Sequence, residues 1–82
     1  MTTTARIRDL VLRNTQWTGS PDDLTDELPL IEGQVIDSLD LLTIISALEK
    51  EFDLDIPDED LLFDNFASIE QIAAYVDARQ AA

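Results

Sequence analysis

The sequence contains no cysteine and no histidine in its 82 residues. Without cysteine the chain cannot form a disulfide, and it has no thiol that could act as a nucleophile or a metal ligand. Without histidine it lacks the most common general base and the most common metal ligand. We therefore expect neither catalytic residues nor a metal site in this chain.

Basic residues are scarce, because five lysines and arginines stand against eighteen aspartates and glutamates, which gives a net charge of −13. Nucleic acid is excluded as a partner, since neutralising phosphates requires many basic side chains. The acidity is uneven: residues 1–36 carry a net charge of −3 and residues 37–82 a net charge of −10. Basic surfaces of other proteins are the natural complement of such a chain.

The chain has only two glycines, no alternation of β-branched residues, and no apolar run of transmembrane length. Its hydrophobic share of 45% is enough for a small core. We therefore expect a single helical domain over residues 1–82, with no membrane segment. The start of the chain has no apolar signal core, so we expect a cytoplasmic protein.

Apolar periodicity predicts an all-α fold, a four-helix bundle of three main helices plus one short third helix, with a long first loop. The main helices are expected at 4–15, capped by Thr3 or Thr4, at 38–52, and from a capping box at Ser68 to about Arg79. The short helix is expected at Asp58–Phe63, followed by a connector whose Phe66 fills the core. The tail from Gln80 is expected to fray.

The connection at 18–36 is unusually long for a small domain, but it is too apolar to be a flexible linker. Pro29 and Gly33 prevent a long helix there, and one helical turn is expected near Asp22–Asp26. Its apolar residues should pin it to the core: Leu24, Leu28, Leu30, Ile31, Val35 and Ile36. The loop would then present the residue that follows it, Ser38, at the surface.

Ser38 stands at the predicted start of the most periodic helix. Asp37 is a good N-cap residue, and Asp37 and Asp40 together have the spacing of a loose capping box. The hydroxyl of Ser38 would lie beside free backbone N–H groups at the positive end of a helix dipole, where a phosphate ester is well tolerated. The alternative is that Ser38 is an ordinary first-turn serine.

The predicted helix at 38–52 has two apolar stripes. One stripe is assigned to the core: Leu41, Ile44, Ile45, Leu48 and Phe52. The second stripe lies about 120° away and consists of Leu39, Leu42 and Ser46, with Glu49 at its edge. We interpret it as a partner-binding face flanked by the carboxylates of Asp37, Asp40 and Glu49. The alternative is that Leu39 and Leu42 pack under the long loop as part of the core.

The segment Leu28–Asp40, which ends in Asp-Ser-Leu-Asp, resembles the phosphopantetheine attachment region of the acyl and peptidyl carrier protein family. The resemblance continues through Ala47–Phe52 and Ile56–Glu59, and then through Asn65–Ile69 and Ile72–Val76. It implies that a phosphopantetheinyl transferase attaches 4′-phosphopantetheine to Ser38. The arm would supply the thiol that the chain lacks and would carry an acyl or aminoacyl group as a thioester.

The resemblance also implies partners and a recognition helix at Leu39–Phe52, in agreement with the second apolar stripe. The expected partners are the transferase and acyltransferase, adenylation or ketosynthase-type enzymes with basic docking surfaces. We expect a free-standing, monomeric carrier, because the sequence begins with Met and ends soon after the last helix.

Three features depart from the pattern of fatty-acid carriers. Gln34 stands where relatives often have glycine, so the turn before Ser38 is expected to differ. Thr43 and Ser46 replace an acid and a larger apolar residue, and the connection at Asp64–Ile69 is longer. These differences favour a stand-alone carrier of polyketide or nonribosomal peptide biosynthesis over a carrier of fatty-acid synthesis.

A rival hypothesis from another class is an acidic helical adaptor that binds a basic protein through Leu39 and Leu42, without a prosthetic group. The two hypotheses differ on the substitution Ser38→Ala. A carrier would lose its function and keep its fold, whereas an adaptor would lose little binding.

Overall fold

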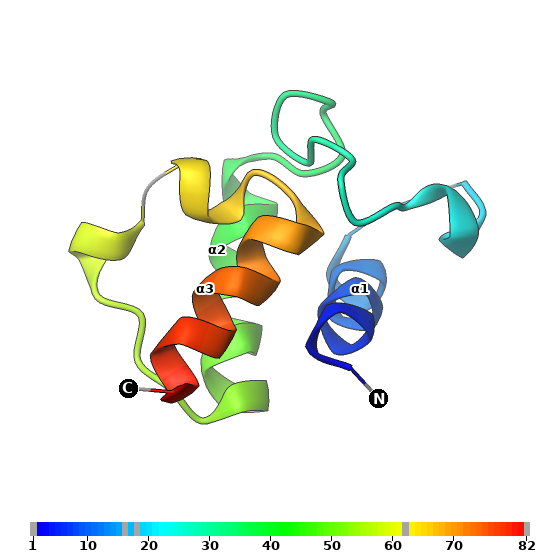
Figure 1. The fold of residues 1–82 in the computed structure, drawn as a ribbon. Helices are drawn as coiled ribbons and strands as arrows, with labels where there is room; N and C mark the ends of the chain where they lie inside the picture. The colour runs from blue at the N-terminus through cyan, green and yellow to red at the C-terminus, as the bar shows by residue number, and fades with distance from the viewer. Residues whose placement is uncertain (1, 16, 18, 62, 82) are drawn as a thin grey trace.

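The computed structural model contains three α-helices joined by loops and 3₁₀ turns, and it describes residues 2–15, 17, 19–61 and 63–81 (Figure 1). The α-helices are α1 (Thr3–Asn14), α2 (Ser38–Phe52) and α3 (Ile69–Ala81). The 3₁₀ turns are η1 (Pro21–Asp23), η2 (Asp58–Asp60) and η3 (Phe63–Phe66). These ranges contain no strand, so the predicted all-α class is confirmed. None of the described helices is long and apolar enough to cross a membrane.

Helix α1 begins one residue earlier than predicted. The side chain of Thr2 accepts a hydrogen bond from the N–H of Ala5 at 3.1 Å, so Thr2 is the N-cap, not Thr3 or Thr4. Its apolar residues lie on one face at helical spacing, and Ile7, Leu10 and Val11 are buried. This face places α1 against both α2 and α3.

The core is built from all three helices and the long loop. In α2 the predicted core stripe is confirmed: Ile44, Ile45, Leu48 and Phe52 are buried, and Leu41 is half-buried. The loop and the two other helices fill the remaining space with further buried residues, among them Leu24, Leu30, Ile36, Ile69, Ile72 and Val76. The predicted connection begins at residue 18, which lies outside the described residues, and from 19 to 36 it is an ordered part of the domain, as its apolar content predicted.

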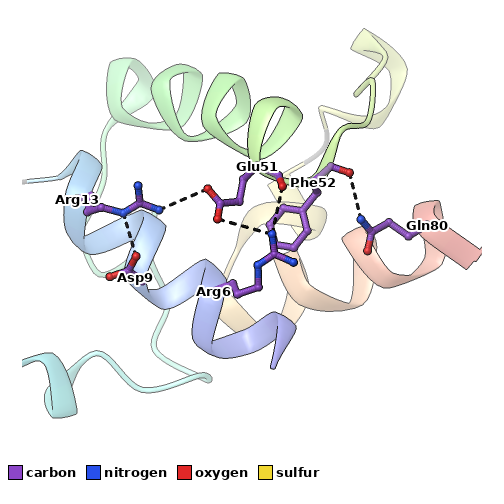
Figure 2. Close-up of polar contacts among 6 residues, drawn as sticks. All are labelled: Arg6, Asp9, Arg13, Glu51, Phe52 and Gln80. Carbon is purple, nitrogen blue, oxygen red and sulfur yellow. Dashed lines mark hydrogen bonds and ion pairs between the residues drawn. The ribbon is translucent and has the colours of Figure 1, made fainter. Parts of the chain in front are cut away.

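A cluster of polar contacts joins the helices at the C-terminal end of α2 (Figure 2). The guanidinium of Arg6 lies 4.2 Å from the centre of the Phe52 ring, and it donates a hydrogen bond to the backbone carbonyl of Glu51 at 3.1 Å. The Glu51 carboxylate also forms ion pairs with Arg6 and Arg13, each at 3.6 Å. These contacts attach α1 to the end of α2 that is farthest from Ser38.

The expectation that the chain frays from Gln80 is wrong for that residue. Helix α3 continues to Ala81, and the side-chain amide of Gln80 donates a hydrogen bond to the carbonyl of Phe52 at 3.1 Å (Figure 2). This carbonyl belongs to the last turn of α2, where no further helical N–H is available to it. This hydrogen bond holds the last turn of α3 against the end of α2, and the apolar periodicity of the sequence gives no sign of it. Ala82, at the end of the predicted tail, lies outside the described residues.

The predicted short helix at Asp58–Phe63 is a 3₁₀ turn at its start, η2, and the second 3₁₀ turn, η3, begins at Phe63; Leu62 lies outside the described residues. The backbone carbonyl of Asp60 accepts a hydrogen bond from the side-chain amide of Asn65 at 2.9 Å. A side-chain donor therefore takes the place that a backbone N–H would have in a continuing α-helix. Phe66 is 1% exposed, so its predicted place in the core is confirmed.

The η2 turn is also tied to α3 through Tyr75. The Tyr75 hydroxyl donates a hydrogen bond to Oδ2 of Asp60 at 2.7 Å, and Arg79 lies 3.7 Å from the same oxygen. Burial of the phenol, followed by the hydrogen bond to Asp60 and the charge of that carboxylate, raises the pKa of Tyr75 to about 12.

We expect the single tyrosine to titrate with a pKa of about 12 when absorbance at 295 nm is followed against pH, because burial and the contact with Asp60 disfavour the phenolate. In Asp60→Asn the pKa should fall but stay above 10, because burial of the ring remains. The raised pKa stabilises the fold at and below pH 10, and this contribution should be lost as the pH rises from 10 to 12. A wild-type tyrosine that titrates near 10 would contradict the contact.

Candidate functional site

The long loop is held in place by the backbone of Leu30, whose side chain is fully buried. The N–H of Leu30 donates to the carbonyl of Ala67 at 2.8 Å, which joins the loop to the segment before α3. The carbonyl of Leu30 accepts hydrogen bonds from Val35 and Ile36 at 2.9 and 3.1 Å. The loop therefore folds back on Leu30 immediately before Ser38, and this arrangement sets where α2 begins.

The turn between Leu30 and Val35 contains two residues with special backbone requirements. Gln34 has a φ of 59°, in the left-handed region that favours glycine, although it carries a side chain. A Cβ added to Gly33 would lie 2.4 Å from the carbonyl oxygen of Pro29, so no larger residue fits there without a backbone shift. The sequence pointed to this turn because Gln34 stands where related carriers often have glycine. The structure shows that glutamine adopts the left-handed conformation there.

Ser38 is the first residue of α2 and is exposed. The predicted capping box is confirmed: Oδ1 of Asp37 accepts from the Asp40 N–H at 2.8 Å, and Oδ2 of Asp40 accepts from the Asp37 N–H at 3.4 Å. The carbonyl of Asp37 also accepts from the N–H of Leu41 at 2.9 Å. The box fixes the first turn of α2 and with it the position of the serine hydroxyl.

The surroundings of Ser38 suit a phosphate ester better than catalysis. The hydroxyl projects from the first turn of a 15-residue helix, whose unpaired N–H groups and dipole favour a negative group. The neighbouring carboxylate of Asp37 is already used to cap the helix. An exposed serine without a base to deprotonate it is a poor nucleophile, so this site does not have what self-contained catalysis by Ser38 would require.

The second stripe of α2 is exposed to solvent. Leu39 is 74% exposed and Leu42 is 57% exposed, and Ser46 is exposed on the same face. The alternative that the two leucines pack under the loop is therefore wrong. Large apolar side chains this exposed are typical of a contact surface, so the interpretation of this stripe as a partner-binding face remains a prediction.

The structure brings four of the predicted site residues together, namely Asp37, Ser38, Leu39 and Asp40 at the start of α2. Glu49 lies about 16 Å from Ser38 along the helix axis. It is half-buried, and its Oε2 accepts a hydrogen bond from the Ile56 N–H at 3.0 Å, so it helps to hold the segment after α2. Sequence reasoning missed this contact because its partner lies outside the helix.

Among the described residues, no group of three or more acidic side chains is arranged so that it could hold a metal ion. A shallow hollow lies beside the start of α2 and is lined by Ile31, Gln34, Val35, Ile36, Asp37 and Asp40. The hollow combines apolar walls with two carboxylates. The site therefore offers a partner protein both an apolar and an acidic surface next to the exposed hydroxyl.

Comparison with known proteins identifies the family of this chain. The family model for the phosphopantetheine attachment site matches residues 5–76. The acyl carrier protein of Bdellovibrio bacteriovorus is 31% identical over 74 residues, which cover 90% of each chain. The acyl carrier protein of Campylobacter fetus is 32% identical over 71 residues, which cover 87% of each.

A solved structure is also similar to this chain. It contains an engineered glycine:[carrier protein] ligase of Bradyrhizobium japonicum in complex with AMP and with a carrier protein from Agrobacterium tumefaciens. The match has a TM-score of 0.79 and 28% identity, and it covers 90% of this chain and 97% of the other.

We expect Gln34→Gly to raise the free energy of unfolding by about 0.5–1 kcal/mol, because glycine relieves the left-handed backbone at a smaller entropic cost. The matched control is Gly33→Ala, which should lower it by more than about 1 kcal/mol, since the new methyl group meets the Pro29 carbonyl. Urea denaturation measures both. A Gln34→Gly variant less stable than wild type would contradict the left-handed turn.

Proposed function

Because this chain belongs to the family of carrier proteins that bear 4′-phosphopantetheine, we propose that Ser38 is the residue to which this group is attached. The chain is a carrier used by partner enzymes and not a catalyst. When bound, 4′-phosphopantetheine supplies the terminal thiol on which acyl or aminoacyl groups are carried as thioesters.

The observation that carries the proposal is the placement of Ser38 itself. The serine is exposed in the first turn of α2, the capping box of Asp37 and Asp40 fixes that turn, and the loop anchored at Leu30 delivers it to the surface. The phosphate would be held as an ester of the Ser38 hydroxyl, at the end of a helix whose dipole favours a negative charge.

The proposed docking surface is the exposed stripe beside Ser38. Leu39 and Leu42 provide its apolar centre, with Ser46 farther along the same face, and Asp37 and Asp40 provide carboxylates for basic groups of the partner. Electrostatic steering is well suited to a protein with a net charge of −13, because it accelerates encounters with basic surfaces. A phosphopantetheinyl transferase and a cargo-loading enzyme would use this surface in turn.

For the pathway, we propose polyketide or nonribosomal peptide biosynthesis in the cytoplasm, with the chain acting as a monomer. The replacements at Thr43 and Ser46 and the long connection before α3 support this over fatty-acid synthesis. An aminoacyl cargo is supported by the similarity to a carrier protein bound to a glycine:[carrier protein] ligase. Acyltransferase, adenylation-type and ketosynthase-type enzymes are the corresponding partner classes.

We expect wild-type protein to gain one phosphopantetheine when it is incubated with coenzyme A, magnesium and a broad-specificity phosphopantetheinyl transferase. Ser38→Ala should gain none and keep its melting temperature. Ser20→Ala is the matched control, because it removes an exposed serine hydroxyl outside the docking surface and should be loaded normally. Intact-mass spectrometry separates these outcomes, and a folded wild type that gains no mass would favour the adaptor hypothesis.

We expect the double substitution Leu39→Ala, Leu42→Ala to lower the kcat/KM of the transferase about five- to tenfold, since two apolar contacts are lost. The free energy of unfolding should change by less than about 1 kcal/mol, because both side chains are exposed.

The buried control, Leu48→Ala, should behave in the opposite way. It should cost about 2–5 kcal/mol of stability and leave the kcat/KM of the folded fraction unchanged. An unchanged kcat/KM in the double variant would show that Leu39 and Leu42 do not belong to the docking surface.

A further inference from the structure

Lys50 is the only lysine of the chain, and it lies on the same exposed face of α2 as the docking stripe. At 100° per residue, it shares an arc of about 100° with Leu39, Leu42, Thr43 and Ser46. All five residues are exposed. The stripe therefore ends in a positive charge, about 18 Å along the helix axis from Ser38.

The other basic residues are used inside the fold. All four arginines form ion pairs, namely Arg6 with Glu51, Arg8 with Asp26, Arg13 with Asp9 and Glu51, and Arg79 with Asp60. In the part of the chain that the structure describes, no carboxylate lies within 4.0 Å of the Lys50 ammonium. In a chain with eighteen acids, Lys50 thus presents its charge to solvent.

Both acids next to Lys50 in the sequence have partners within the protein, and Glu51 forms its ion pairs with Arg6 and Arg13. Glu49 uses its Oε2 to accept from the Ile56 N–H, which holds its side chain against the segment after α2. A shallow hollow opens at this point, and it is lined by Ser46, Lys50 and Leu54 together with the acids Glu49, Asp53 and Asp55. The C-terminal half of the stripe therefore offers a partner a cationic group beside a depression.

We propose that Lys50 is a docking residue that pairs with a carboxylate on the surface of a partner enzyme. The partner would place apolar side chains on Leu39 and Leu42, basic groups near Asp37 and Asp40, and the carboxylate at Lys50. The proposal deepens the proposed carrier function and rests on it.

In direct contact, Lys50 favours a negative group at one end of the stripe, and Asp37 and Asp40 favour positive groups at the other end, which sets the direction in which a partner lies along α2. A partner surface with basic groups at both ends would bring like charges together at Lys50, which is unfavourable. Asp53 and Asp55 line the same hollow, so a carboxylate experiences attraction only in direct contact with Lys50. The ion pair between Lys50 and the partner's carboxylate therefore favours partners whose carboxylate lies opposite Lys50 when their apolar groups contact Leu39 and Leu42. The acids near Ser38 provide the long-range attraction.

The experiment is a double-mutant cycle between this protein and a designed helical peptide. The peptide is capped at both ends, spans the distance from Ser38 to Lys50, and has an apolar stripe, arginines at one end and a glutamate at the other. A second peptide has glutamine in place of the glutamate. Each is titrated into ¹⁵N-labelled wild type and Lys50→Gln, in apo and phosphopantetheine-loaded form, and the dissociation constants are compared.

Wild type should bind the glutamine peptide about two- to fivefold more weakly than the glutamate peptide, as expected for an exposed ion pair. Lys50→Gln should bind both equally, and Lys50→Arg should restore the difference. The cycle cancels the general effect of the net charge, since both peptides meet the same acidic chain. Equal ratios in wild type and Lys50→Gln, or no binding at 39–50 in the amide shifts, would overturn the proposal.

Phosphopantetheine loading of wild type and Lys50→Gln is followed by mass in parallel. Loading of both with no coupling between Lys50 and the glutamate overturns this inference alone. Failure of folded wild type to load overturns the proposed function and the inference with it.

Discussion

The backbone of Leu30 is the point on which the functional end of this domain depends. Its buried side chain anchors the long loop, its N–H reaches the segment before α3, and its carbonyl binds Val35 and Ile36. The N–H of Glu70, in the first turn of α3, also binds the carbonyl of Asp26 in the loop at 2.9 Å. The loop is thus attached to α3 on one side and to the start of α2 on the other. These few hydrogen bonds give an irregular segment a defined path to Ser38.

The two ends of α2 have different tasks. At the C-terminal end, Arg6, Arg13 and Gln80 join α1 and α3 to α2 through ion pairs, a ring contact and a hydrogen bond (Figure 2). At the N-terminal end, the capping box fixes the first turn and leaves Ser38 and Leu39 exposed. One end therefore supplies stability, and the other can present a reactive group without contributing to the core.

The charge distribution follows the same division. The arginines form ion pairs within the domain, where they neutralise acids between elements, as Arg8 does with Asp26 in the loop. The carboxylates at the start of α2 serve as helix caps and still contribute to an acidic surface beside Ser38. In the proposed function, the part of the domain is to hold the Ser38 hydroxyl, and the group attached to it, within reach of partner enzymes.

The α-helices, the buried stripe of α2, the capping box and the place of Ser38 in the first turn could be predicted, because they depend on residues within a few positions of one another. The left-handed turn at Gln34, the inward contact of Glu49 and the two 3₁₀ turns after Pro57 depend on contacts between distant segments, so they could not be predicted. The exposure of Leu39 and Leu42 also comes from the fold, because helical periodicity allowed these side chains to be either buried or exposed. Periodicity places a residue on a face of a helix, but what covers that face depends on hydrogen bonds and packing between segments far apart in the chain.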